Sequence, residues 1–270
     1  MKTRMLNLNL LAIVGLLSLI ALVACTTSPG VAPTTAFAAL TVPTATIAAT
    51  PASDVTNVDE NGSIAINQTA LSGALDQIAA GQVSNAEIDG ILYMREEEKL
   101  ARDVYLILYQ KWELPIFQNI AGSEATHMEA VKPLIDRYGL EDPAAGEIGV
   151  FTDPTLQELY DRLVADGSKS LADALHVGAA IEEIDILDLE EQIAQTDKAD
   201  IELVYENLMK GSRNHLRAFT STLEKQTGET YQPQYLDPVA YETIVSTPRE
   251  TGGGGRDQGQ GQRQGQRGNG

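Results

Sequence analysis

Histidines and carboxylates fall inside stripes of apolar side chains that otherwise read as the inner faces of helices. Glu124 and His127 lie three residues apart in the middle of one such stripe, and residues at this spacing share one face of a helix. Glu98, Glu182 and His215 lie within comparable stripes of three other segments. Burial of a carboxylate without a partner is costly, so these positions call for a specific partner.

Metal ions would supply such a partner. Carboxylates gathered from several helices repel one another unless positive charge lies between them. Carboxylate oxygens and imidazole nitrogens from facing helices are a suitable ligand set for iron or manganese. Asp185, one helical turn beyond Glu182, adds a further acid. We therefore predict a metal site with six candidate ligands: Glu98, Glu124, His127, Glu182, Asp185 and His215.

The glutamate run at residues 96–98 leaves its inward member open. Glu98 shares a face with apolar neighbours, but Glu97 is an alternative because a helical wheel does not separate the two cleanly. Glu96 is expected on the solvated side with Lys99 and Asp103. A second interpretation is that the whole run is a solvated helix face.

Other residues offer an explanation of the acids that needs no metal. Arg102 and Arg213 could neutralise Glu182 and its neighbours, which would make the cluster a structural network of salt bridges. His215 could be a hydrogen-bonded histidine of the core. Tyr105 fits either a core position or one close to the site.

The segments that must position these residues carry helical rather than alternating patterns. Four are long, at residues 85–112, 115–138, 170–195 and 199–226, and two are short, at 67–80 and 156–165. The connection from residue 139 to 167 is long enough to let the second and third long helices run parallel. We predict an all-α fold: a four-helix bundle with a long crossover between helices 2 and 3.

The N-terminus has the pattern of a secretion signal over residues 1–24. Lys2 and Arg4 precede an apolar run, and small residues precede Cys25, as in cleavable signals. The end of this segment resembles the lipobox of bacterial lipoproteins, in which the cysteine becomes the lipidated first residue. Cys25 is the only cysteine, so no intramolecular disulfide can form. We expect an exported protein of the cell envelope, lipid-anchored to a membrane; the alternative is an uncleaved anchor helix.

The composition of the remaining segments limits the folded part to residues 63–246. Residues 25–62 are rich in Thr, Ala, Pro and Ser, which is typical of a flexible linker. Residues 247–270 are mostly Gly, Gln and Arg and are expected to be disordered. The formal net charge of −19 argues against nucleic acid as a partner.

Three segments carry a resemblance to a known family: residues 96–105 (EEEKLARDVY), 123–129 (SEATHME) and 211–216 (GSRNHL). Over roughly residues 88–244 the chain resembles a bacterial ferritin-like family catalogued as domain of unknown function 2202. It resembles rubrerythrins more remotely. Their Glu-Ala-Arg-Tyr pattern of the first helix matches Glu98 to Tyr105, and their second-helix Glu-x-x-His matches Glu124 and His127.

The resemblance implies a ferritin-like bundle that carries a di-iron site. The carboxylate of the third helix matches Glu182. The final Glu-x-x-His departs from the pattern, because Ser212 stands where such sites carry a glutamate, three residues before His215. This departure puts a second metal position in doubt.

The resulting functional prediction is an envelope-anchored metal-binding protein. The resemblance implies a di-iron oxidoreductase acting on O2 or peroxide. The alternatives are a non-catalytic bundle that sequesters metal and a structural or partner-binding bundle. The sequence leaves the oligomeric state open; a homodimer is one option, because dimers are common among bundles of this type.

Overall fold

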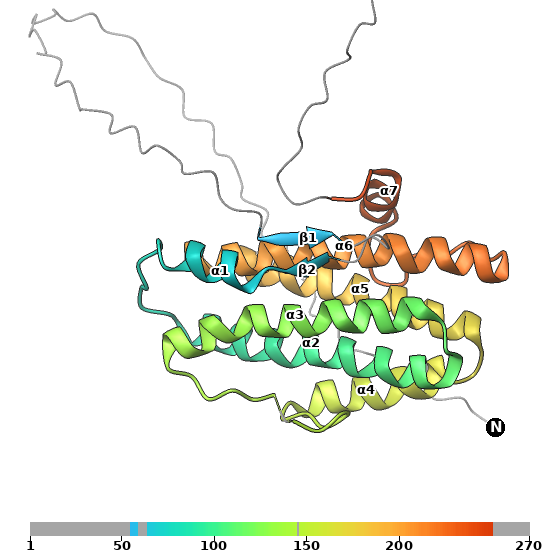
Figure 1. The fold of residues 1–270 in the computed structure, drawn as a ribbon, viewed down its shortest axis with the longest axis horizontal. Coiled ribbons are helices and arrows are strands. Elements are labelled where there is room, and N and C mark those ends of the chain that lie inside the picture. The colour runs from blue at the N-terminus through green and yellow to red at the C-terminus, as the bar shows by residue number, and fades with distance from the viewer. Residues whose placement is uncertain (1–54, 59–63, 145, 251–270) are drawn as a thin grey trace, which may run out of the picture. The chain divides into compact units, whose positions relative to one another are not determined.

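The computed structural model describes residues 55–58, 64–144 and 146–250, and this part of the chain is mostly helical (Figure 1). The all-α expectation is therefore confirmed, apart from one pair of three-residue strands. The elements in chain order are β1 (Thr56–Val58), β2 (Ile64–Ile66), α1 (Gln68–Leu75), α2 (Asn85–Trp112), α3 (Pro115–Tyr138), α4 (Pro154–Gly167), α5 (Leu171–Ala194), α6 (Ala199–Thr227) and α7 (Pro238–Ser246).

The long helices begin and end close to where the sequence predicts, because their ends carry strong local signals. Ser84 and Glu87 form a capping box at the start of α2: the serine hydroxyl accepts from the Glu87 N–H, and the Glu87 carboxylate accepts from the Ser84 N–H. Gly139 and Gly228 end α3 and α6 with φ of 65° and 76°. This left-handed conformation suits glycine at a helix end.

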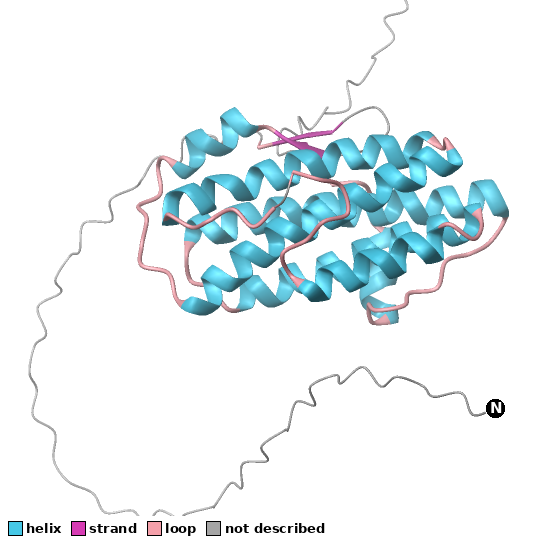
Figure 2. Cartoon of the chain, turned by 90° about the horizontal axis from the view of Figure 1, so that it is seen from below, coloured by secondary structure: helices cyan, strands magenta, loops and turns pink. Residues whose placement is uncertain are grey.

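Four long helices, α2, α3, α5 and α6, pack side by side (Figures 1 and 2). Along the α2–α5 contact, the Tyr93 hydroxyl donates a hydrogen bond to Asp188, and the Tyr105 hydroxyl donates one to Glu182. Because the later residue of α2 meets the earlier residue of α5, these two helices run antiparallel. Helix α3 is antiparallel to α2 because residues 113 and 114 alone join them. Helices α3 and α5 are therefore parallel, as the long connection between them predicts.

That connection is fixed to α2 by buried charged side chains. Lys99 donates to Asp103 (2.6 Å) and to the main-chain oxygens of Glu147 (2.8 Å) and Val150 (3.1 Å). Asp103 also accepts from the Gly149 N–H at 3.0 Å. Because both side chains are fully buried, the loop before α4 depends on this ion pair.

The expectation that this side of α2 faces solvent is wrong. Glu96 is only 2% exposed, and Lys99 and Asp103 are 0% exposed. The Glu96 carboxylate accepts from the N–H groups of Thr152 and Asp153. The crossover covers this face of the helix, and its main-chain donors replace water as partners of the acid.

Short segments on either side of the predicted domain also pack on the long helices. Strands β1 and β2 pair antiparallel, and the Ile66 N–H donates to Thr126 of α3 at 2.9 Å. At the other end, Glu250 accepts from Arg213 and Arg217 of α6. Residues 55–58 and 247–250 therefore belong to the folded part, although the sequence assigns them to linker and tail. The predicted signal, Cys25 and the tail after residue 250 lie outside the described residues.

The hydrophobic core consists of two clusters at opposite ends of the four long helices. One is centred on Val104, Phe117 and Phe219, and the other on Met94, Val131 and Leu208. On α2, α3 and α6 the predicted site residues fall between members of the two clusters. None of the described helices is both long and apolar enough to cross a lipid bilayer.

We predict that Asp103→Ala lowers the free energy of unfolding by about 3 kcal/mol, because removal of one partner leaves the buried Lys99 charge uncompensated. Urea unfolding followed by circular dichroism measures the change. The matched control is Asp136→Ala, which removes an exposed pair with Lys132 at the same i, i+4 spacing and should cost under about 1 kcal/mol.

The double variant Lys99→Met with Asp103→Leu should lose less stability than Asp103→Ala alone, because neither charge is then left buried. Equal losses for Asp103→Ala and Asp136→Ala would contradict the role assigned to the buried pair.

Candidate metal centre

The centre of the cluster is a carboxylate held between two histidine rings. Glu124 Oε2 lies 2.7 Å from Nδ1 of His127, and Glu124 Oε1 lies 2.8 Å from Nδ1 of His215. The two rings stack with centroids 5.4 Å apart. Helix α3 supplies Glu124 and His127 on one face, and α6 supplies His215. Each oxygen of one carboxylate thus faces a different imidazole.

A second carboxylate completes each half of the cluster. Glu98 Oε2 lies 3.3 Å from the His127 nitrogen, and Glu182 Oε2 lies 3.5 Å from that of His215. Ligand atoms of Glu98, Glu124 and His127 lie within 4.8 Å of one another, as do those of Glu124, Glu182 and His215. The two groups share Glu124, and each has the size of a metal site.

The electrostatics of the cluster centre on Glu124. Burial alone would raise the pKa of its carboxyl, but His215 and His127 together hold that pKa well below its usual range. Burial also disfavours charge on the two imidazoles, yet Glu124 raises the pKa of His215 to about 9 and that of His127 well above its ordinary value. With no metal bound, the protonated imidazoles and the Glu124 carboxylate therefore stabilise one another.

The two outer carboxylates, Glu98 and Glu182, have raised pKa values, in contrast to Glu124. Burial, only partly opposed by His127, raises the pKa of Glu98 to about 7. Burial and the negative charge of Glu124 raise the pKa of Glu182 to about 7. Two histidines therefore do not compensate all three acids, and the centre favours additional positive charge.

Neighbouring hydroxyl groups orient these residues. Tyr105 donates to Glu182 Oε1 at 2.5 Å, and the Ser123 hydroxyl lies 3.0 Å from Nε2 of His215. The hydroxyl of Ser123 thus engages the outer nitrogen of His215 and leaves Nδ1 turned toward the carboxylates. Such contacts fix the orientation of metal-binding side chains. Tyr105 accordingly lies beside the site as well as in the core.

Asp185 lies beside the cluster but outside both groups of close ligand atoms. Its Oδ2 accepts from the hydroxyl of Ser212, and its Oδ1 accepts no hydrogen bond from the residues that the structure describes. Burial and the charge of Glu98 raise its pKa well above the usual range. The serine that replaces a glutamate of the ferritin-like pattern therefore bonds an acid on the facing helix.

Glu97 and Glu98, the two candidates for the inward-facing member of the run at residues 96–98, are both buried. Their surroundings differ. Glu98 points to His127, whereas Glu97 has Asp188 and Asp185 as its nearest charges, and burial together with these charges raises its pKa strongly. No donor among the described residues bonds either carboxylate oxygen of Glu97. Glu98 is the member that joins the cluster.

The two arginines that could have neutralised the cluster are paired elsewhere. Arg102 bonds Asp103, and Arg213 bonds Glu250. The alternative in which these arginines compensate Glu182 and its neighbours is therefore wrong. Both side chains are partly exposed and turn away from the faces that meet between the helices.

Sequence reasoning missed Gly211, which the site requires. A Cβ at this position would lie 2.3 Å from Cε1 of His127 and 2.5 Å from Nε2. The only sequence signal is a glycine in the interior of a long helix, four residues before His215, at a position where glycine weakens the helix. Its lack of a side chain lets the His127 ring lie flat against α6.

The fold and the cluster define a mostly helical protein with a buried carboxylate–histidine cluster, and comparison with known proteins shows the family to which it belongs. Residues 87–248 match DUF2202, described as an uncharacterized protein domain. The match spans more than half of the chain. The protein therefore belongs to this family.

One relative is also known as a crystal structure. The uncharacterized protein MJ0754 of Methanocaldococcus jannaschii is 56% identical over 171 residues, which cover 63% of this chain and 92% of the relative. The crystal structure of hypothetical protein MJ0754 from Methanococcus jannaschii has a TM-score of 0.63 at 55% identity and covers 64% of this chain and 99% of its own. The similarity extends over the helical domain.

We predict that Gly211→Ala destabilises the protein, although alanine normally favours a helix over glycine by up to about 1 kcal/mol. The new methyl group would displace the His127 ring from Glu124. The control is Gly122→Ala on α3, where a Cβ meets nothing within 4 Å and where alanine should stabilise the protein. Urea unfolding distinguishes the two signs, and stabilisation by Gly211→Ala would show that the ring moves freely.

Proposed function

We propose that the four long helices form a ferritin-like bundle that binds two iron or manganese ions at the buried cluster. Glu124 would bridge the two ions. Glu98 with His127 would bind one, and Glu182 with His215 the other. Ferritin-like di-metal sites use glutamates from two helices and Glu-x-x-His pairs from the other two. Glu98, Glu182 and the Glu124–His127 pair match this pattern, whereas α6 supplies the histidine without the glutamate.

The observation that carries the proposal is buried negative charge without a basic partner from Lys or Arg. Glu98, Glu124 and Glu182 are each at most 2% exposed, and their ion-pair partners among the described residues are His127 and His215. Buried charges need pairing or metal coordination. Since Arg102 and Arg213 pair with other acids, a network of structural salt bridges accounts poorly for this centre.

The donor set fits iron and manganese in its chemistry. Carboxylate oxygens and imidazole nitrogens suit both ions. The departure at Ser212 removes one carboxylate from the pattern, and Asp185 is the nearest replacement. Since the Ser212 hydroxyl donates to its Oδ2, Asp185 would offer Oδ1 and thereby be a sixth ligand residue.

We further propose that the centre is a redox site. When bound, two ferrous ions would supply two electrons that, with two protons, reduce one molecule of hydrogen peroxide to two of water. The residues of the chain would hold the centre in position: Tyr105 orients Glu182, Ser123 orients His215, and the two apolar clusters exclude bulk water. Non-catalytic storage of metal is the second candidate, favoured by the nearly complete burial of the ligands.

We predict that the full-length protein, reconstituted with Fe(II), retains about two ions per chain and that Glu124→Gln retains fewer than half as many. The amide keeps the size of the side chain but cannot bridge two cations as a carboxylate does. The control is Glu96→Gln, which neutralises a buried acid of α2 outside the cluster and should bind as much iron as the wild type. Elemental analysis after gel filtration gives the ratio.

The same preparations test the redox step. The iron-loaded wild type should consume peroxide and develop ferric absorption, whereas the Glu124→Gln variant should not. Retention of iron without any reaction would favour storage. If the wild type retains neither iron nor manganese, the metal proposal fails.

Export and lipid anchoring through Cys25 are also proposals, and they rest on the pattern of residues 1–25. When the full chain is expressed in a bacterial host, the mature protein should begin at Cys25, carry a lipid mass and fractionate with membranes. The variant Cys25→Ser should lose the lipid and the membrane association. A mature N-terminus upstream of residue 25 would contradict the proposal.

A further inference from the structure

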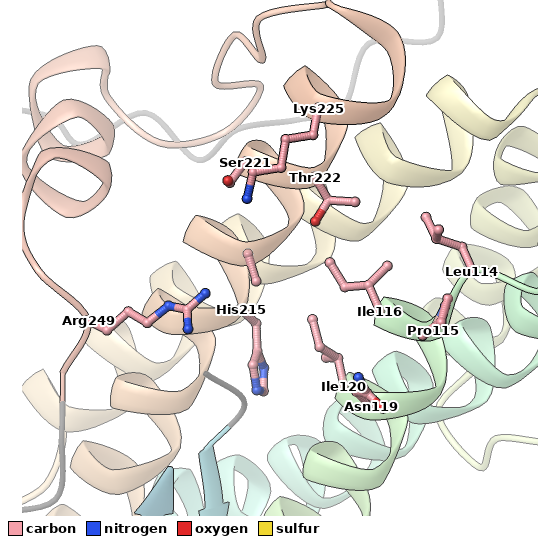
Figure 3. Close-up of a pocket in the computed structure, with 11 residues that line it drawn as sticks. Leu114, Pro115, Ile116, Asn119, Ile120, His215, Ser221, Thr222, Lys225 and Arg249 are labelled. Carbon is pink, nitrogen blue, oxygen red and sulfur yellow. The ribbon is translucent and has the colours of Figure 1, made fainter. Parts of the chain in front are cut away.

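A pocket of about 350 Å³ lies between α3 and α6 and reaches His215 (Figure 3). The α3 side contributes the apolar side chains of Leu114, Ile116 and Ile120 together with the amide of Asn119. On α6, Ser221 and Thr222 add hydroxyl groups. Pockets of this volume hold small organic molecules. His215 lines the inner end of the pocket but is itself 0% exposed, so the pocket ends against this residue of the cluster.

Two cations line this pocket and lack acidic partners. Most described basic side chains are in ion pairs, as expected for a chain with 38 acidic and 19 basic residues. Lys225 and Arg249 are exposed and pair with no described acid. Two unpaired cations at one pocket favour an anionic ligand.

The C-terminal segment is anchored where it brings Arg249 to the pocket. The Glu250 carboxylate accepts from Arg213 at 2.7 Å and 2.5 Å, and its main-chain oxygen accepts from Asn214 at 2.8 Å. These bonds hold residue 250 on α6. Figure 3 accordingly shows Arg249 beside the helix that carries His215.

A larger pocket along α2 and α5 has the opposite character. Its lining includes Asp89, Glu96, Asp153 and Glu191, with no basic residue among the lining groups. An anion would be repelled there. Charge therefore distinguishes the two pockets and assigns anionic ligands to the one at His215.

We propose that the pocket at His215 binds a small organic anion with a short apolar body, such as a medium-chain carboxylate. The anionic group would lie near Lys225 and Arg249, and the apolar body would pack on Leu114, Ile116 and Ile120. This proposal goes beyond the proposed function, because binding uses groups outside the metal ligands.

The test is calorimetric titration of the full-length protein with octanoate, before and after loading with iron. We expect binding in both forms. The double variant Lys225→Gln with Arg249→Gln should weaken it at least about tenfold. The matched control is Lys111→Gln with Arg162→Gln, which removes one lysine and one arginine that are likewise exposed and in no ion pair, and it should stay within about twofold of the wild type.

Two further measurements decide between charge and simple apolar contact. Octylammonium has the same chain with the opposite charge and should not bind. Thr222→Trp should fill the pocket and abolish octanoate binding while the iron content stays unchanged. Equal binding of octanoate and octylammonium, or no octanoate binding by the wild type, overturns the proposal. If the protein binds octanoate but retains no metal, the proposal for the pocket holds and only the proposal for the metal centre fails.

Discussion

The rest of this structure depends on one desolvated interaction, the contact of Glu124 with His127 and His215. A carboxylate between two imidazoles at 2.7 Å and 2.8 Å can be buried only if the helices that carry these groups are held in fixed register. The two apolar clusters on either side supply that register and remove water. Gly211 leaves space for the His127 ring. Tyr105 orients Glu182, and Ser123 orients His215.

The glutamate run of α2 shows how three adjacent acids are buried by three different means. Glu96 accepts main-chain hydrogen bonds from the crossover, Glu97 faces acids of α5 and carries a raised pKa, and Glu98 faces His127. Successive residues of a helix point about 100° apart, so three consecutive side chains meet three different surfaces. The crossover therefore helps to shield the site, because it covers a face of α2 that would otherwise be in contact with water.

The sequence predicts the four long helices and the members of the cluster because both depend on local pattern. Helical periodicity and terminal glycines define the elements, and Glu-x-x-His in an apolar stripe identifies Glu124 and His127. The burial of Lys99 and Asp103 could not be predicted, because it depends on a loop distant in sequence that folds over them. Gly211 escaped for the same reason, since its neighbour His127 lies on another helix and only close packing reveals the contact.

The two histidines of the centre are both fully buried, but they have different neighbours, and this difference bears on where chemistry could take place. The His127 ring packs against Gly211, so closely that even a methyl group would collide with it. The His215 side adjoins a pocket whose unpaired cations contrast with the acidic protein as a whole. An open coordination position is useful only where a reactant can reach it. If the proposed metal centre forms, the pocket beside His215 is therefore the side from which a reactant would approach, whereas the His127 side is filled by α6.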